Sequence, residues 1–205
     1  MNKLVILHTT LQEIIHPLGY NSEDASVPDS IADVIYPVNA FLASSISTED
    51  RVKVLLICKK DLEGRFTQNL ESFTDEFDRL CGKLCQTYDI QIITTSYGSE
   101  TITQKQVIKQ IVDAIDPGCE IISDITYGSK DFAILLMCVL SFAIKHLNCI
   151  ADHILYREVF FKNGAPTNPV LRNFAPLLHL TSLTYTLNSN SPEQARNLLD
   201  TILSF

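Results

Sequence analysis

Short apolar segments recur along the first 125 residues of the chain, and none of them alternates with polar positions. They span residues 3–7, 52–58, 90–94 and 120–125. Strands that are apolar on both sides lie inside a parallel sheet covered by helices. Segments with helical spacing lie between and after them, at residues 38–45, 67–88, 104–115 and 129–147. This alternation predicts a Rossmann-like, doubly wound and mostly parallel α/β sheet with right-handed crossovers.

The pattern changes after residue 149. Residues 150–161 (IADHILYREVFF) predict a long strand, residues 162–169 a turn, and residues 170–187 an extended return. Residues 191–203 open with SPEQ, which supplies a capping serine, a first-turn proline and an acidic residue at a helix start. The sequence thus predicts one domain over residues 1–205, with a hairpin-like C-terminal extension over residues 150–205.

Residues 17–30 (PLGYNSEDASVPDS) form a polar segment with two prolines and one glycine. Loops of this length are uncommon in compact domains and often serve as lids or binding loops. A lid and a disordered surface loop are both consistent with the segment.

The composition limits the possible functions. The 205 residues are 46% hydrophobic and carry a net charge of −8, from 16 Lys and Arg against 24 Asp and Glu. Binding to duplex nucleic acid needs a basic surface, and no cluster of Lys and Arg supplies one. An anionic ligand would have to be held in a locally arranged pocket.

The cysteines and the apolar segments indicate a cytoplasmic protein without a membrane partner. The six cysteines lack metal-binding spacing, which favours reduced and mostly buried thiols, and the start MNKLVILHTT is too short in apolar residues for a secretory signal. The most apolar segment, residues 132–144, falls short of the ~20 residues that span a bilayer, so it predicts a buried helix.

Ligands of open α/β sheets bind beyond the carboxyl ends of the strands, where the strand order reverses. Two polar loops follow apolar strands in this way. They are His8-Thr9-Thr10 after the first strand and Thr126-Tyr127-Gly128-Ser129-Lys130 after the fourth.

The second loop has the composition of a phosphate site. It opens a long predicted helix, whose first backbone N–H groups lack intrahelical partners and attract anions. Gly128 permits close approach of the backbone, Thr126 and Ser129 offer hydroxyls, and Lys130 adds a positive charge.

The same residues also fit a purely structural junction. In that interpretation Asp124 or Ser129 caps the helix, Gly128 makes the turn, and Lys130 is solvated. The common nucleotide motifs are absent, because the chain contains neither GxGxxG nor GxxxxGK[ST].

Three stretches of the chain resemble the CRISPR-associated Rossmann-fold (CARF) family. They are DITYGSK followed by an apolar helix, ILYREVFF, and PVNAFLASS ahead of VKVLLIC. Tyr127 stands where many of these proteins have histidine, and Ser129-Lys130 resembles the Thr-Lys or Ser-Lys pair of other CARF groups.

The resemblance implies a homodimer whose two-fold axis passes through a composite pocket for cyclic oligoadenylate, the messenger of type III CRISPR antiviral defence. A symmetric ring suits a symmetric dimer, because each half presents the same donors to opposite phosphates. By position, the residues expected to contact ribose, phosphate and base are His8, Thr9, Thr10, Asp124, Thr126, Tyr127, Gly128, Ser129 and Lys130.

The chain departs from the family in lacking a recognisable effector domain. Arg172 and His179, in RNFAPLLH, have the spacing of a HEPN ribonuclease motif, but Pro176 lies between them. A CARF domain alone would be a ring nuclease that degrades the messenger, or a sensor that regulates a separate effector protein.

We expect the ring nuclease, with cyclic tetra-adenylate as its first substrate. A ribose 2′-hydroxyl would attack the adjacent phosphate, with Lys130, Ser129 and His8 as the catalytic candidates and with neither metal nor cofactor. The products would be linear di-adenylates ending in a 2′,3′-cyclic phosphate. A small-molecule α/β enzyme outside CRISPR systems is a third possibility.

Overall fold

The computed structural model describes residues 1–12, 16–59, 67–95 and 101–203. Its strands are β1 (Asn2–His8), β2 (Asn21–Ser22), β3 (Arg51–Lys59), β4 (Thr87–Thr95), β5 (Glu120–Asp124), β6 (Ile150–Lys162) and β7 (Ala165–Asn173). Its helices are α1 (Pro37–Ser45), α2 (Thr67–Leu80), α3 (Thr101–Asp113), α4 (Lys130–Leu147), α5 (Ala175–Thr186) and α6 (Pro192–Leu203).

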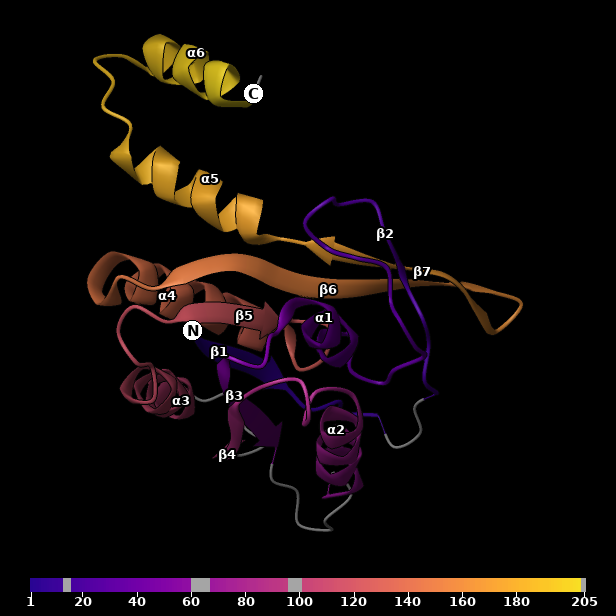
Figure 1. Ribbon diagram of the computed structural model, residues 1–205. Coiled ribbons are helices and arrows are strands. Elements are labelled where there is room, and N and C mark those ends of the chain that lie inside the picture. Colours follow the sequence, from indigo (N-terminus) through magenta and orange to yellow (C-terminus); the bar gives the residue numbers. More distant parts are fainter. Residues whose placement is uncertain (13–15, 60–66, 96–100, 204–205) are drawn as a thin grey trace.

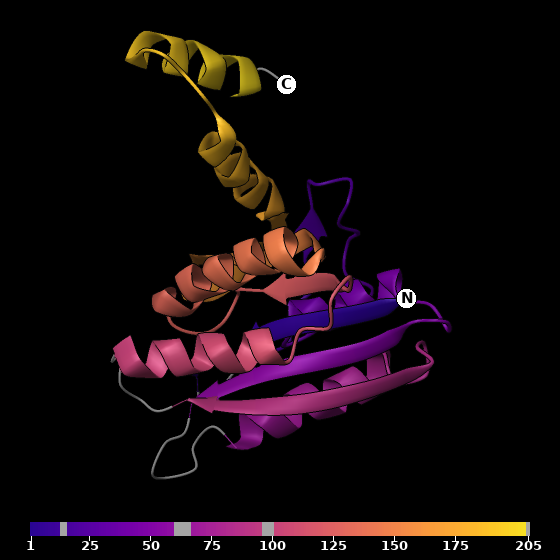
Figure 2. The ribbon, with the colours of Figure 1, turned by 90° about the vertical axis from the view of Figure 1, so that its left-hand side faces the viewer.

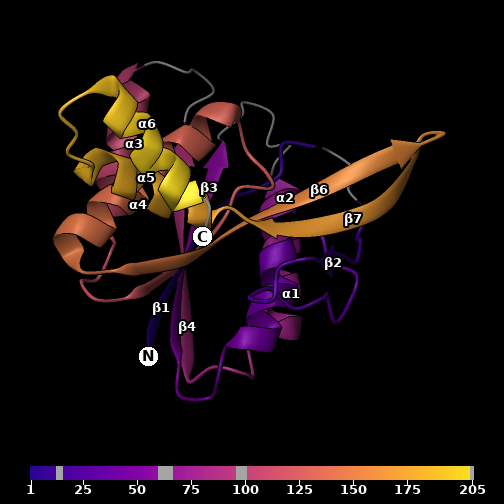
Figure 3. The same ribbon diagram turned by 90° about the horizontal axis from the view of Figure 1, so that it is seen from above.

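All seven strands form one sheet in the order β2-β7-β6-β5-β1-β3-β4. Every neighbouring pair is parallel except β6 and β7. Helices α1 and α2 cover one face and α3 and α4 cover the other (Figure 1). The view from above shows the same three layers (Figure 3). The predicted Rossmann-like α/β fold is confirmed.

The apolar strands supply both halves of the core. Leu4 and Ile6 of β1 face the cluster under α3 and α4, whereas Val5 and Leu7 face the cluster under α1 and α2. Alternate side chains of a strand point to opposite faces, so a strand buried on both sides must be apolar throughout.

The strand order reverses between β1 and β5. From β1 the chain moves outward through β3 to β4, then returns by way of α3 to β5 on the other side of β1. Leu7 of β1 lies beside Asp124 at the end of β5. The loops that follow these two strands therefore meet at the topological switch point.

The C-terminal extension differs from its prediction in two ways. The turn between β6 and β7 is only Asn163-Gly164, whose φ angles of 53° and 78° suit a tight hairpin turn. The expected turn over 162–169 was therefore too long. Its prolines lie in β7 instead, where Pro166 is opposite Phe161.

The expected extended return over 170–187 was wrong beyond Asn173. Pro176 lies in the first turn of α5, where its missing N–H costs nothing. The Asn173 side chain accepts a hydrogen bond from the Ala175 N–H at 3.0 Å and so starts the helix. Arg172 consequently lies on a strand and His179 on a helix, so the two do not share the helix that a HEPN motif needs.

Of two other predicted helices, the one over 67–88 is shorter than expected and the one over 191–203 is confirmed. The predicted helix over 67–88 ends at Leu80. Tyr88 lies in β4, because the stretch Thr87–Thr95, which is rich in Ile and Thr, pairs with β3. The predicted helix over 191–203 is confirmed as α6. Figures 1 and 2 show α5 and α6 projecting from the body, and no residue of α6 is buried.

Residues 17–30 are tied to the far end of the sheet in this structure. Asn21 and Ser22 form β2 on the outside of β7, and the Tyr20 N–H donates to the Ser30 hydroxyl at 2.8 Å. Movement of this segment as a lid stays a prediction, and it would have to break these bonds.

Candidate functional site

The two predicted loops adjoin at the carboxyl edge of the sheet. Gly128 has a φ of 100°, a conformation that side chains other than glycine rarely adopt. A β-carbon at Gly128 would lie 2.9 Å from the His8 β-carbon and 3.2 Å from a ring carbon of Phe132. Glycine therefore lets the loop after β5 press directly on the end of β1.

His8 is held between the loops as a neutral ring. The side chain is 3% exposed and packs edge-on against Phe132, with the ring centres 5.3 Å apart. Its Nδ1 lies 2.6 Å from the Thr9 carbonyl oxygen, which can only accept, so Nδ1 carries the proton and Nε2 has the lone pair. Burial, reinforced by the positive charge of Lys59, lowers the His8 pKa to about 4.

The two threonines after β1 are also buried. The Thr9 N–H donates to the Ile57 carbonyl at 2.9 Å, and the Thr10 hydroxyl accepts from the Gln12 N–H at 3.1 Å. The Thr9 hydroxyl is buried beside the Cys58 thiol, which is a polar neighbour for it among the described side chains.

Asp124 fixes the shape of the second loop from beneath. One carboxylate oxygen accepts from the Thr126 N–H at 2.8 Å, and the other accepts from the Val38 N–H at 3.2 Å in the first turn of α1. Burial raises the pKa of this carboxyl group, and the two N–H donors and Arg157 oppose that effect. Asp124 therefore caps α1, not α4 as one interpretation of the sequence had it.

Tyr127 and Thr126 point into the scaffold. The Tyr127 hydroxyl donates to the Ile35 carbonyl at 2.9 Å and accepts from Arg157 at 2.9 Å. The Thr126 hydroxyl accepts from the Arg157 N–H at 2.9 Å. These side chains hold the loop in place, and their predicted ligand contacts would have to come from their backbone groups.

Arg157, on β6, organises this network and was absent from the predicted site. It is 5% exposed, and its guanidinium donates to the carbonyls of Leu18, Val34 and Ile35 at 2.8–3.0 Å. Arg157 is part of the ILYREVFF stretch, but the carbonyl groups that it binds lie more than 120 positions earlier in the chain, so no local pattern pointed to this role.

At the start of α4, Lys130 is exposed and Ser129 is half-buried. Ser129 is the N-cap residue and makes no side-chain cap bond to the helix. Its hydroxyl lies beside Asp131 and holds the pKa of that carboxyl below its usual range. Lys130 is exposed and has no ion-pair partner within the described ranges. The loop thus offers one hydroxyl and one ammonium group to a ligand.

Lys59 is a second cation near the loops that the sequence did not suggest. It ends β3, next to β1, and its charge acts on both His8 and Asp131. The site therefore combines two lysines with the amide groups at the N-terminus of α4.

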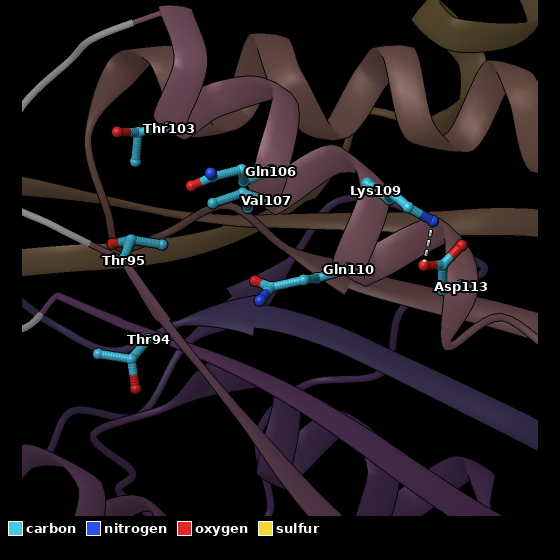
Figure 4. Close-up of a pocket in the computed structure, with 8 residues that line it drawn as sticks. All are labelled: Thr94, Thr95, Thr103, Gln106, Val107, Lys109, Gln110 and Asp113. Carbon is cyan, nitrogen blue, oxygen red and sulfur yellow. Dashed lines mark hydrogen bonds and ion pairs between the residues drawn. The ribbon is translucent and has the colours of Figure 1, made fainter.

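Two grooves lie away from these loops. One, of about 570 Å³, lies between the end of β4 and α3, and Thr95, Gln106 and Gln110 are among the residues that line it (Figure 4). The other, of about 500 Å³, lies at the opposite edge, where β1, β3 and β4 begin. Neither groove contains a residue of the predicted site.

A scan against protein-family models found no match for the chain, and neither did a search of curated proteins. Within the described ranges, no helix combines the length and apolarity needed to cross a membrane. The described residues also contain no cluster of three or more His, Cys, Asp or Glu side chains that could bind a metal ion.

Proposed function

We propose that the chain binds cyclic oligoadenylate, most readily cyclic tetra-adenylate, across a homodimer and cleaves it without a metal ion. The proposal rests on the junction at residues 124–130. Its sequence resembles the CARF signature, and its exposed Lys130 and half-buried Ser129 lie beside the loop that follows β1 at the switch point. This is where an open α/β sheet binds its ligand.

The geometry suits a phosphodiester. The N-terminus of α4 presents backbone N–H groups without intrahelical partners, and Lys130 adds a full charge at the same helix end. Donors of this kind stabilise the additional negative charge that forms on phosphorus as a 2′-hydroxyl attacks. Alignment of attacker, phosphorus and leaving oxygen would supply the rest of the rate enhancement.

His8 fits a positioning role better than proton transfer at neutral pH. A group with a pKa of about 4 is a weak base at pH 7 and cannot act as an acid there. Its contact with Gly128 instead fixes how closely the loop after β5 approaches the end of β1.

A sensor without cleavage activity is the second candidate. The observation that favours it is the projecting arm of α5 and α6, which exposes Leu183, Tyr185 and Leu203. Exposed apolar side chains on a projecting arm suit contact with a separate effector protein.

Cleavage can be tested with purified protein and cyclic tetra-adenylate in EDTA, with the products resolved by mass spectrometry. We expect linear di-adenylates with a 2′,3′-cyclic phosphate. Lys130→Ala should slow cleavage by about 100-fold, the usual effect of removing one donor to a developing anion.

Lys145→Ala is the matched control, because Lys145 is an exposed lysine at the other end of the same helix. It should cleave like the wild type. If the protein binds the ring but does not cleave it, the ring nuclease is excluded and the sensor is supported. If the protein neither binds nor cleaves any cyclic oligoadenylate, both candidate functions are refuted.

A further inference from the structure

The two ends of the sheet differ in how they are closed. One end is β2, only two residues long, and the other is β4, with nine residues. Exposed strand edges invite pairing with another chain, and monomeric proteins blunt them with short strands, Lys, Pro or bulges. β2 uses the first of these devices.

β4 uses none of them. Its sequence, TYDIQIITT, contains no Lys, Pro or Gly and only one charge, on Asp89. Its register with β3 runs without a shift from Thr87 to Thr95. Tyr88 and Ile92 are 40% and 48% exposed, although both are typical of paired strands.

We propose that β4 pairs with β4 of a second copy of this chain, antiparallel, about a two-fold axis through Gln91. The sheet would then run continuously through both copies. This interface is isologous, since the same strand serves both sides. It does not rest on the proposed function, because β3 separates β4 from β1 and the predicted site.

The register follows from symmetry and length. A two-fold axis normal to the sheet keeps each face on its own side, so a residue can only be opposite one that points the same way. An axis at Gln91, the middle of the strand, pairs all of β4, with Thr87 opposite Thr95. An axis at Ile92 would leave Thr87 and Tyr88 without partners.

The side chains are complementary in that register. Ile92 lies opposite the partner's Ile90, and Tyr88 opposite the partner's Thr94, on the face toward α2. Paired β-branched and aromatic side chains are favourable across antiparallel strands. The exposed part of Ile92 thereby gains an apolar neighbour.

The single charge is also compatible with this register. Asp89 lies opposite the partner's Ile93, so the two carboxylates are not adjacent. An axis at Asp89 would place them directly opposite, which is unfavourable. On the α3 face, the groove beside Thr95 leaves room at the end of the strand (Figure 4).

A cysteine at the axis gives the sharpest test. In Gln91→Cys the two thiols would face each other across residues whose Cα atoms are about 4.5–5.5 Å apart, within disulfide range. Mild oxidation with diamide should give a covalent dimer, and peptide mapping should find residue 91 joined to residue 91. Asp89→Cys is the matched control, because its two copies would lie roughly 14 Å apart along the strands.

A second variant tests whether strand pairing causes the cross-link. Adding Ile92→Lys to Gln91→Cys should lower the yield of dimer by about tenfold, because a charge would face the partner's Ile90. Ile92 is half exposed, so unchanged thermal unfolding and circular dichroism should show that each copy still folds. Absence of the 91–91 link, equal linking through residue 89, or a yield unaffected by Ile92→Lys would each overturn the proposal.

Discussion

Gly128 combines a strained backbone with a close contact. Its φ of 100° disfavours any side chain, and His8 and Phe132 fill the space that a β-carbon would need. Both effects act on the loop that carries Ser129 and Lys130, so the residue couples stability to the shape of the site.

Gly128→Ala should therefore lower the free energy of unfolding by about 2–4 kcal/mol, measured by urea denaturation. Gly164→Ala separates the two causes, since Gly164 has a φ of 78° but no atom lies within 4 Å of the position that its β-carbon would take. It should cost only about 1 kcal/mol, the backbone effect alone. Equal losses would mean that the contact with His8 is unimportant.

His8 makes a prediction about pH. Its pKa is about 4 in the folded chain and 6.5 when unfolded, so the unfolded chain binds the proton first as the pH falls. The stabilisation is complete above pH 6.5 and is lost as the pH drops toward 4, by roughly 3 kcal/mol in total.

Urea denaturation between pH 7 and pH 4.5 can detect this slope. His8→Asn should flatten it. A wild-type slope that persists in His8→Asn would assign the effect to other groups.

The sequence predicted that the loops after β1 and β5 meet, because both follow apolar strands of a parallel sheet and so lie at the same edge. It did not predict which side chains face inward. The partners of Asp124 and Tyr127 are backbone groups of Val38 and Ile35, more than 80 positions earlier, and no local pattern reveals them.

Arg157 links three elements through one guanidinium. It ties β6 to the segment before α1 and to Tyr127 of the loop after β5. Glu76 of α2 secures the same segment from the other side by accepting from the N–H groups of Ile35 and Tyr36. The position of the loop thus depends on side chains from β6 and α2.

Arg157→Met should destabilise the chain by about 3 kcal/mol in urea denaturation, because the carbonyl groups of Leu18, Val34 and Ile35 would each lose a charged donor and keep only one neutral donor. Arg172→Met, on the neighbouring strand, is the control. Arg172 is 43% exposed and pairs with Glu158 at the surface, so its loss should cost less than about 1 kcal/mol. Similar losses for both would argue against the network.

Element boundaries were predictable where hydrophobic periodicity decides them and not where turn chemistry does. The Asn163-Gly164 pair is a typical two-residue hairpin turn, but Pro166 and Pro169 suggested a longer one. β7 accepts them because its outer neighbour, β2, pairs with it only at Val170 and Leu171. The apolar residues after Asn173 fit a strand or a helix, and Pro176 favours the helix.

The whole molecule presents three surfaces of different character. The carboxyl edge of the sheet carries Lys59, Lys130 and the N-terminus of α4. The outer edge of β4 pairs with no other described strand and carries one charge, and the α5–α6 arm exposes several large apolar side chains. Among the described residues, the first of these surfaces has the groups that suit a phosphate ligand. A dimer formed there and pairing through β4 use different parts of the chain, so one assembly can contain both.

The stoichiometry of binding tests the central claim most directly. Native mass spectrometry and isothermal titration calorimetry with cyclic tetra-adenylate should give one ring for every two chains, and Lys130→Ala should weaken that binding. A cleavage-deficient variant or short incubation at low temperature keeps the ring intact during the measurement. One ring per chain, or no binding of any cyclic oligoadenylate, would contradict a composite site built from two copies of residues 124–130.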